Sequence, residues 1–199
     1  MKQYRRKDMI SKPCIGFALC GSFCTFKSVI AEMERMHEAG YELYPILSEH
    51  AASTDTRFGD AADFREKIEK ICGRPAITTF TQVEELGPKK LIDAIVVAPC
   101  TGSTLGKLAN GISDTAVTFA VKGCLRNDKP VVIALSTNDA LGASAANIGA
   151  LLARRGVYFV PFAQDDPENK PRSAVSDVRL IPAAVEKALE GRQIQPILL

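Results

Sequence analysis

Short apolar runs alternate with longer segments of helical periodicity along most of this chain. Continuous apolar runs, which are typical of strands buried on both faces of a sheet, cover 14–20, 41–47, 94–98, 130–135 and 157–162. Apolar residues at helical spacing predict helices over about 25–39, 60–72, 114–124, 143–155 and 178–190, and another that begins near Leu105. A short extended segment is expected over 77–80 and a helical turn over 82–85.

Strands that alternate with helices through short connections predict the fold class. The expected architecture is α/β, a Rossmann-like, doubly wound parallel sheet in three α/β/α layers. With 199 residues and no internal boundary in composition, the chain is expected to form a single domain over 1–199. The basic segment 1–12 is expected to be a flexible arm, and the polar, proline-containing segment 164–172 a mobile loop.

Composition and charge narrow the class of function. The 25 basic and 23 acidic residues leave a net charge of +2, so no strong attraction to nucleic acid is expected. No apolar run reaches transmembrane length and no signal peptide is recognisable, which predicts a cytoplasmic protein without membrane contact. The 6 cysteines form no Cys-x-x-Cys pair and there are 2 histidines, so no metal site is predicted and the thiols are expected to be reduced and mostly buried.

The segment 91–114 carries the strongest sign of a ligand site. Its apolar run stops at Pro99, and hydroxyl-bearing and glycine residues over 101–104 lead into the next helix. Such a loop presents backbone N–H groups and hydroxyls at the positive end of a helix, which suits a phosphate. Ordinary helix caps explain the same hydroxyls, and the pattern alone does not separate these two interpretations.

The other loops at the carboxyl ends of the predicted strands narrow the ligand further. They cover 21–25, 48–55 and 136–142, and the ligands of doubly wound sheets bind at this edge. The first turn lacks the Gly-x-Gly-x-x-Gly pattern, so Glu49 is only weak evidence for the ribose of a dinucleotide. The hydroxyl-rich loops at Ser22 and at 101–104 better suit one terminal phosphate and a flat ring.

Several of these residues together point to a known family. They are Gly21-Ser22 after the first strand, Ser48 after the second, Pro99-Cys100-Thr101-Gly102-Ser103-Thr104, and Ala109-Asn110-Gly111-Ile112-Ser113-Asp114. The set resembles the homo-oligomeric flavin-containing cysteine decarboxylases, a Rossmann-like group of FMN-binding proteins, from about Cys14 to Phe162. The resemblance implies a trimer or a dodecamer, a substrate-facing Asn138 and an FMN site. That site would be formed by Gly21, Ser22, Ser48, Pro99, Thr101, Ser103 and Thr104.

Two departures argue against the decarboxylation that is usual in that family. Ala76 stands where the decarboxylases carry a catalytic histidine, and Ser103 replaces the asparagine of their motif. Alanine can neither move a proton nor orient a carboxylate. The catalytic residues are therefore unknown. His50, after the second strand, is a weak candidate for acid–base chemistry, and an exposed loop histidine without a role is the simpler interpretation.

Other side chains have two interpretations each. Arg57, Lys107, Lys122 and Arg172 are candidates for binding carboxylates, with plain surface solvation as the alternative. Cys100 follows a strand directly and is a candidate for contact with the flavin, although a buried structural thiol is the simpler interpretation.

Within the family, the chain is most similar to proteins that form one subunit of a two-subunit oxidoreductase. The likeness lies in the runs over 17–25, 45–49 and 136–142. It implies that the chain helps to dehydrogenate a dihydropyridine to a pyridine-2,6-dicarboxylate in the mother cell of a sporulating bacterium, with NAD(P) on the partner subunit. A stand-alone FMN-dependent decarboxylase, a flavin prenyltransferase-like enzyme and a non-catalytic assembly partner are the alternatives.

Overall fold

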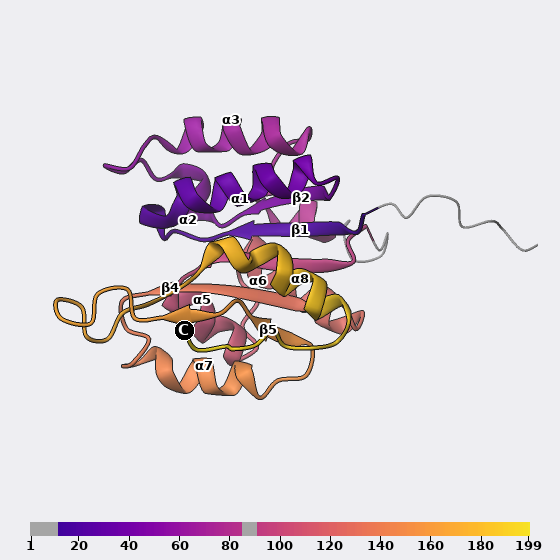
Figure 1. Ribbon diagram of the computed structural model, residues 1–199. Helices are drawn as coiled ribbons and strands as arrows, with labels where there is room; N and C mark the ends of the chain where they lie inside the picture. The colour runs from indigo at the N-terminus through magenta and orange to yellow at the C-terminus, as the bar shows by residue number, and fades with distance from the viewer. Residues whose placement is uncertain (1–11, 85–90) are drawn as a thin grey trace, which may run out of the picture.

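The computed structural model of the protein describes residues 12–84 and 91–199 (Figure 1). Apart from Lys12, the expected flexible arm over 1–12 lies outside the described residues, and so does Glu85 at the end of the expected turn over 82–85. Across the two described ranges, no helix is long and apolar enough to cross a membrane.

Parallel strands form the centre of the sheet, as the apolar runs predict. They are β1 (Cys14–Leu19), β2 (Glu42–Leu47), β3 (Ala94–Cys100), β4 (Val131–Thr137) and β5 (Val157–Phe159). Their order is β2-β1-β3-β4, with β5 paired to β4. The chain runs from β1 outward to β2 and then returns to the other side of β1, so the winding reverses between β1 and β3. The prediction of a doubly wound sheet is therefore confirmed.

Helices cover both faces of this sheet. They are η1 (Phe23–Thr25), α1 (Phe26–Glu38), α2 (Glu49–Ser53), α3 (Ala61–Cys72), α4 (Phe80–Glu84), α5 (Gly102–Ala109), α6 (Ala116–Arg126), α7 (Ser144–Leu152), η2 (Val178–Leu180) and α8 (Ile181–Leu189). Figure 1 shows α8 in front of the strands and α6 behind them. Side chains of α1, α3 and α8 belong to one hydrophobic core, and those of α5, α6 and α7 to another. The three expected α/β/α layers are thus confirmed.

Each central strand contributes to both cores because its side chains alternate. In β3, Ala94 and Val96 pack with the first core, whereas Ile95 and Val97 pack with the second. Every residue of β3 and β4 is buried. A strand buried on both faces has no solvent-facing side for polar residues, which explains why its sequence is a continuous apolar run rather than an alternating one.

The sheet also contains antiparallel strands that the hydrophobic pattern did not predict. The single strand expected over 157–162 is wrong, because the chain leaves β5 after Phe159 and starts β6 (Phe162–Ala163) after Pro161, which has no N–H for a ladder. A further strand, β7 (Ala174–Ser176), pairs antiparallel with β6 and with Ser136 and Thr137 of β4. The connection from β6 to β7 therefore ends beside the carboxyl end of β4.

Some helix starts also differ from the prediction. α6 begins at Ala116 because Thr115 and Thr118 form a capping box, in which each hydroxyl accepts from the other residue's N–H at 3.1 Å. α3 begins after Asp60 as expected, but the Asp60 side chain makes no cap hydrogen bond. Asp55 performs that role instead, since its carboxylate accepts from the first N–H of α3 at 2.9 Å.

Candidate functional site

The carboxyl ends of the parallel strands meet at one edge of the sheet, on the left in Figure 1. Residues with hydroxyl or amide side chains follow four of these strands there: Ser22 after β1, Ser48 after β2, Thr101 after β3 and Asn138 after β4. The fold therefore brings residues that are far apart in the sequence to the edge at which ligands of such sheets bind.

The turn after β1 reaches across the end of β3 to β4. The hydroxyl oxygens of Ser22 and Ser136 are 2.8 Å apart, although β3 lies between their strands. The Thr25 hydroxyl donates to the Ser22 carbonyl at 2.9 Å and holds the turn in place. A serine hydroxyl can accept two hydrogen bonds and donate one, so this pair still has capacity for a ligand.

β3 and α5 are closer in the chain than predicted. The strand does not stop at Pro99 but runs to Cys100, with a shift in its register to β4 after Val97, and α5 begins at Gly102 rather than near Leu105. The intervening residue, Thr101, is the N-cap of α5. The site loop is therefore a single tight turn from a buried strand into a helix.

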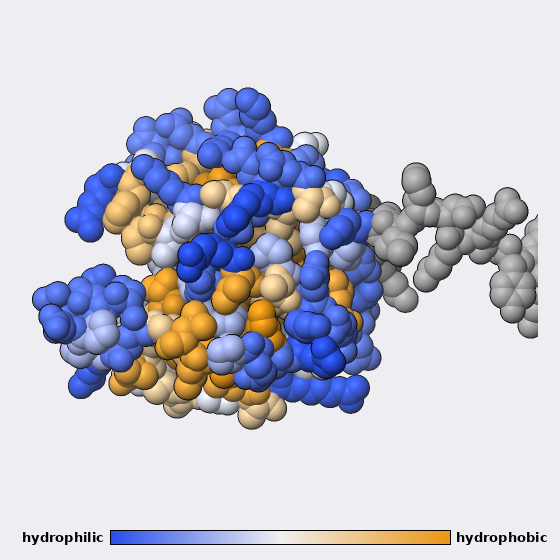
Figure 2. Space-filling view, in the orientation of Figure 1, coloured by the Kyte–Doolittle hydropathy of each residue, from blue (hydrophilic) through white to orange (hydrophobic). Residues whose placement is uncertain are grey.

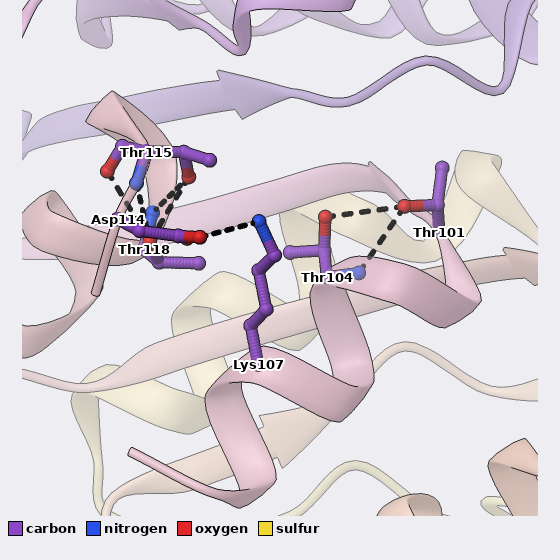
Figure 3. Close-up of polar contacts among 6 residues, drawn as sticks. All are labelled: Thr101, Thr104, Lys107, Asp114, Thr115 and Thr118. Atoms are coloured by element: carbon purple, nitrogen blue, oxygen red, sulfur yellow. Dashed lines mark hydrogen bonds and ion pairs between the residues drawn. The ribbon is translucent and has the colours of Figure 1, made fainter. Parts of the chain in front are cut away.

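Thr101 caps the start of α5 through the Thr104 N–H (Figure 3). The Thr101 hydroxyl accepts from the Thr104 N–H at 3.3 Å and lies 3.1 Å from the Thr104 hydroxyl, which also lies 3.3 Å from the Cys20 sulfur. The cap interpretation is thus correct for the Thr101 hydroxyl, whereas the Thr104 hydroxyl accepts from no N–H of α5. The first backbone hydrogen bond of α5 is donated by the Leu105 N–H to the Thr101 carbonyl. The N–H groups of Gly102 and Ser103, which precede it, have no acceptor within the helix and remain open to an anion.

Gly102 lies against a polar cluster at the end of β4. A Cβ at this position would lie 2.8 Å from oxygens of Thr137, Asp139 and Ser144, closer than side chains pack. The Asp139 carboxylate accepts hydrogen bonds from the Thr137 hydroxyl and from the Ser144 hydroxyl, the latter at 2.8 Å. These donors hold the pKa of Asp139 below its ordinary value, so the group is charged at neutral pH. The start of α5 can approach β4 this closely only because residue 102 is glycine.

An ion pair fixes the far end of the motif over 99–114. Lys107 of α5 extends to Asp114, with 2.9 Å between the ammonium and the carboxylate, just before the capping box at Thr115 (Figure 3). The Lys107 ammonium lowers the pKa of Asp114. Because both side chains are substantially exposed, we attribute little stability to this pair. It does occupy Lys107, which makes Lys107 a poor carboxylate ligand.

The remaining predicted residues have different surroundings. Ser48 is buried, and its hydroxyl accepts from the Ala51 N–H at 3.3 Å as the cap of α2. Ser103, Asn138 and His50 are exposed at the same edge. His50 packs beside Gly21, because a Cβ added to Gly21 would lie 3.4 Å from the Cβ of His50. His50 is thus at the rim of the site, whereas Ser48 orders the loop after β2.

The buried thiols near the site are unreactive in this setting. Cys20 and Cys100 are almost completely buried at the ends of β1 and β3. Burial raises the pKa of Cys20 to about 11 and that of Cys100 well above its ordinary value. A protonated thiol is a poor nucleophile, so these residues fill space under the loops.

A separate cavity of about 390 Å³ lies away from the strand ends. Its lining includes Leu108, Ile112, Lys122, Arg126 and Arg154, around the last turns of α5, α6 and α7. Arg126 lies in the last turn of α6, where the helix dipole favours a cation, and Arg154 donates to the Leu108 carbonyl at 3.2 Å, so both arginines are accounted for without a ligand. The site at the strand ends is therefore the stronger candidate.

Comparison with known proteins assigns the chain to a family. The Flavoprotein family profile matches residues 3–178. This chain belongs to the flavoprotein family. The flavoprotein is 44% identical over 185 residues to the B subunit of dipicolinate synthase from Bacillus subtilis (strain 168), covering 93% of this chain and 92% of that one.

Solved structures agree with this assignment. The crystal structure of the dipicolinate synthase B subunit from Bacillus halodurans C superposes with a TM-score of 0.87 at 41% identity, covering 96% of this flavoprotein and 98% of that chain. The FMN-dependent cysteine decarboxylase SpaF superposes with a TM-score of 0.66 at 20% identity, covering 91% and 98%, which shows a shared fold alone. The resemblance drawn from the residues is confirmed.

Sequence reasoning gave no role to the cluster at the end of β4. Gly102, Ser136, Thr137, Asp139 and Ser144 were not among the predicted site residues, yet they tie the turns after β1, β3 and β4 together. The available signal was the change from apolar to hydroxyl and acidic residues over 135–139. It indicated a loop but could not identify the contacts.

We expect Gly102→Ala to lower the free energy of unfolding by about 1–3 kcal/mol, because the added Cβ overpacks the Thr137–Asp139–Ser144 cluster. The control is Gly149→Ala in α7, where an added Cβ meets nothing within 4 Å. It should raise stability by about 0.4–1 kcal/mol. Urea denaturation followed by circular dichroism measures both values, and equal stabilities of the two variants would contradict the close approach.

Asp139 should make stability depend on pH. Its folded-state pKa is lowered, so its charge stabilises the folded state above the unfolded-state pKa of about 3.9, and this contribution is lost as pH falls through the lower folded-state value. The stability difference between the unsubstituted protein and Asp139→Asn should therefore shrink from about pH 6 to about pH 3. Urea denaturation at several pH values measures this, and a difference that stays constant would show that the charge has no such role.

Proposed function

We propose that this flavoprotein is the B subunit of a dipicolinate synthase. Together with a nicotinamide-binding A subunit, it oxidises dihydrodipicolinate to dipicolinate, which is pyridine-2,6-dicarboxylate, during sporulation. The observation that carries the proposal is the 44% identity to the Bacillus subtilis protein over nearly the full length of both chains. The hydroxyl-lined strand ends supply a site of matching kind.

The cofactor of this subunit is FMN. The start of α5 supports the assignment, because the N–H groups of Gly102 and Ser103 have no intrahelical acceptor. Uncharged donors at a helix N-terminus suit a phosphate. The residues that hold it are Gly21, Ser22, Ser48, Pro99, Thr101, Ser103 and Thr104. When bound, the flavin supplies a redox-active flat ring at the strand ends.

The reaction removes a hydride and a proton from the dihydropyridine ring, and formation of the aromatic ring drives it. The hydride passes to NAD(P) on the A subunit. In this subunit, Asn138 orients a carboxylate of the substrate from the turn after β4. His50, exposed at the rim beside Gly21, is the candidate that takes up the proton.

Decarboxylation fits this chain less well. Ala76, at the position that corresponds to the catalytic histidine of the decarboxylases, is 1% exposed and packs in the first core. Its N–H donates to the Glu69 carboxylate at 2.9 Å, so the backbone there is also occupied. A buried methyl group offers no route for a proton.

The partners follow from the same proposal. They are the A subunit of dipicolinate synthase and a small dicarboxylate, with further copies of this chain in a trimer or a dodecamer. The protein acts in the cytoplasm of the mother cell, without nucleic acid or membrane. The chain forms one domain throughout.

A flavin-binding test addresses the cofactor. We expect the purified protein with added FMN to show a visible flavin absorption band after gel filtration. Ser22→Ala should weaken FMN binding about ten-fold, because a hydrogen bond to a charged phosphate is lost. Ser53→Ala, which removes an exposed hydroxyl bonded only to the Glu49 carbonyl within α2, is the control and should bind normally. Absence of any bound flavin would refute this part of the proposal.

A two-component assay addresses the reaction. NAD(P)H formation from dihydrodipicolinate is measured with this chain alone, with the A subunit alone and with both together. We expect rapid turnover only when both are present, because the hydride acceptor is on the A subunit and the proposed substrate contacts, Asn138 and His50, are on this chain. Full turnover by this chain alone, or no effect of adding it to the A subunit, would contradict the two-subunit assignment.

A further inference from the structure

The structure separates the cations that the sequence offered as carboxylate ligands. Lys107 is paired with Asp114, and Lys122 lies 3.4 Å from the Ser113 hydroxyl beside the cavity that is remote from the strand ends. The Arg57 guanidinium stacks on the Phe58 ring at 4.9 Å. Arg172 differs from these residues because its backbone and side chain are both held at the turn between β4 and α7.

Two contacts hold Arg172 at that turn. Its carbonyl accepts a hydrogen bond from the Leu141 N–H at 3.0 Å. Its side chain lies along Gly142, where an added Cβ would be 3.6 Å from both Cδ and Nη1 of Arg172. The same turn carries Asn138, the proposed substrate-binding residue, so a guanidinium is placed within a few residues of it.

The connection from β6 to β7 that presents Arg172 is held by its own hydrogen bonds. Gln164 donates to the Pro171 carbonyl at 2.8 Å, and Lys170 pairs with Asp165 at 3.1 Å. Ser173 then anchors the connection to β4 through the Thr137 carbonyl at 3.4 Å. Figure 2 shows a hydrophilic projection on the left of the molecule, where Figure 1 places this connection, beside a hollow in the same edge.

The charge balance around the turn leaves the Arg172 guanidinium available. Asp139, the acid on the same turn, is engaged by the hydroxyls of Thr137 and Ser144, and Asp165 is engaged by Lys170. Among the ion pairs within residues 12–84 and 91–199, none includes Arg172. An arginine fork without an acidic partner matches a carboxylate with two parallel hydrogen bonds.

We infer that Arg172 binds one of the two carboxylates of the pyridine dicarboxylate, from the turn that also carries Asn138. The inference rests on the proposed function and adds the residue that distinguishes a dicarboxylate from a monocarboxylate. The second carboxylate and the ring lie toward the ends of β1 and β3, where Ser22, Ser103 and the flavin site are located.

The test compares two inhibitors of the complex of both subunits. Pyridine-2,6-dicarboxylate carries the carboxylate that Arg172 would bind, whereas pyridine-2-carboxylate can bind without it. We expect Arg172→Gln to weaken inhibition by the dicarboxylate about 10- to 100-fold, as loss of a charge-assisted hydrogen bond implies, and to change inhibition by the monocarboxylate by less than about three-fold. The KM for substrate should rise while kcat changes little.

Two further variants control the experiment. Arg172→Lys keeps the charge without the fork and should recover part of the dicarboxylate affinity. Arg155→Gln removes an exposed arginine beyond α7, at the opposite end from the strand carboxyl ends, and should have no effect. Equal weakening of both inhibitors by Arg172→Gln, or no weakening of either, would overturn the inference.

Failure of the inference about Arg172 can be distinguished from failure of the proposed function. FMN binding and the need for both subunits are measured on the same preparations. If both hold and Arg172→Gln leaves the discrimination intact, the inference about Arg172 is wrong and the proposed function stands. If the complex shows no turnover with dihydrodipicolinate, the proposed function is wrong and the inference about Arg172 falls with it.

Discussion

Burial of the parallel sheet on both faces is the constraint on which the rest of this molecule depends. Every residue of β3 and β4 is buried, and the apolar side chains of both strands pack in the two cores that the helices cover. Polar groups are costly there, so the sheet can present chemistry only where its strands end. The carboxyl ends carry the hydroxyls, the amide and the helix N-termini that make up the candidate site.

Close packing at those ends turns separate loops into one site. Ser22 reaches Ser136 over the end of β3, and Gly102 lets α5 lie against the Asp139 carboxylate. Each contact joins segments that follow different strands. The hydroxyls of Ser22 and Ser136, and those of Thr101 and Thr104, therefore lie in hydrogen-bonding pairs that hold the loops together.

Two short antiparallel strands, β6 and β7, extend the doubly wound parallel sheet beside β4. β7 pairs with the last residues of β4, and the connection before it places Arg172 on the turn after β4. In the function we propose, residues after the parallel strands hold the cofactor and include Asn138 for the substrate, and the antiparallel addition contributes Arg172 as a second substrate contact. This division would allow substrate choice to change without disturbing the flavin site.

The sequence by itself determined the parallel strands, the layers and the edge at which the site lies, because strands buried on both faces appear as near-continuous apolar runs, and hydroxyl-bearing or amide residues follow several of them. It also identified Ser22, Thr101 and Asn138 at that edge. It misplaced the end of β3 and the start of α5, and it missed β6 and β7, which are too short to leave a periodic signal. Only the tertiary structure decided the bond from Ser22 to Ser136, the contact of Gly102 with Asp139 and the position of Arg172. These contacts join residues that are distant along the chain, and their geometry depends on how the whole sheet packs rather than on any local pattern.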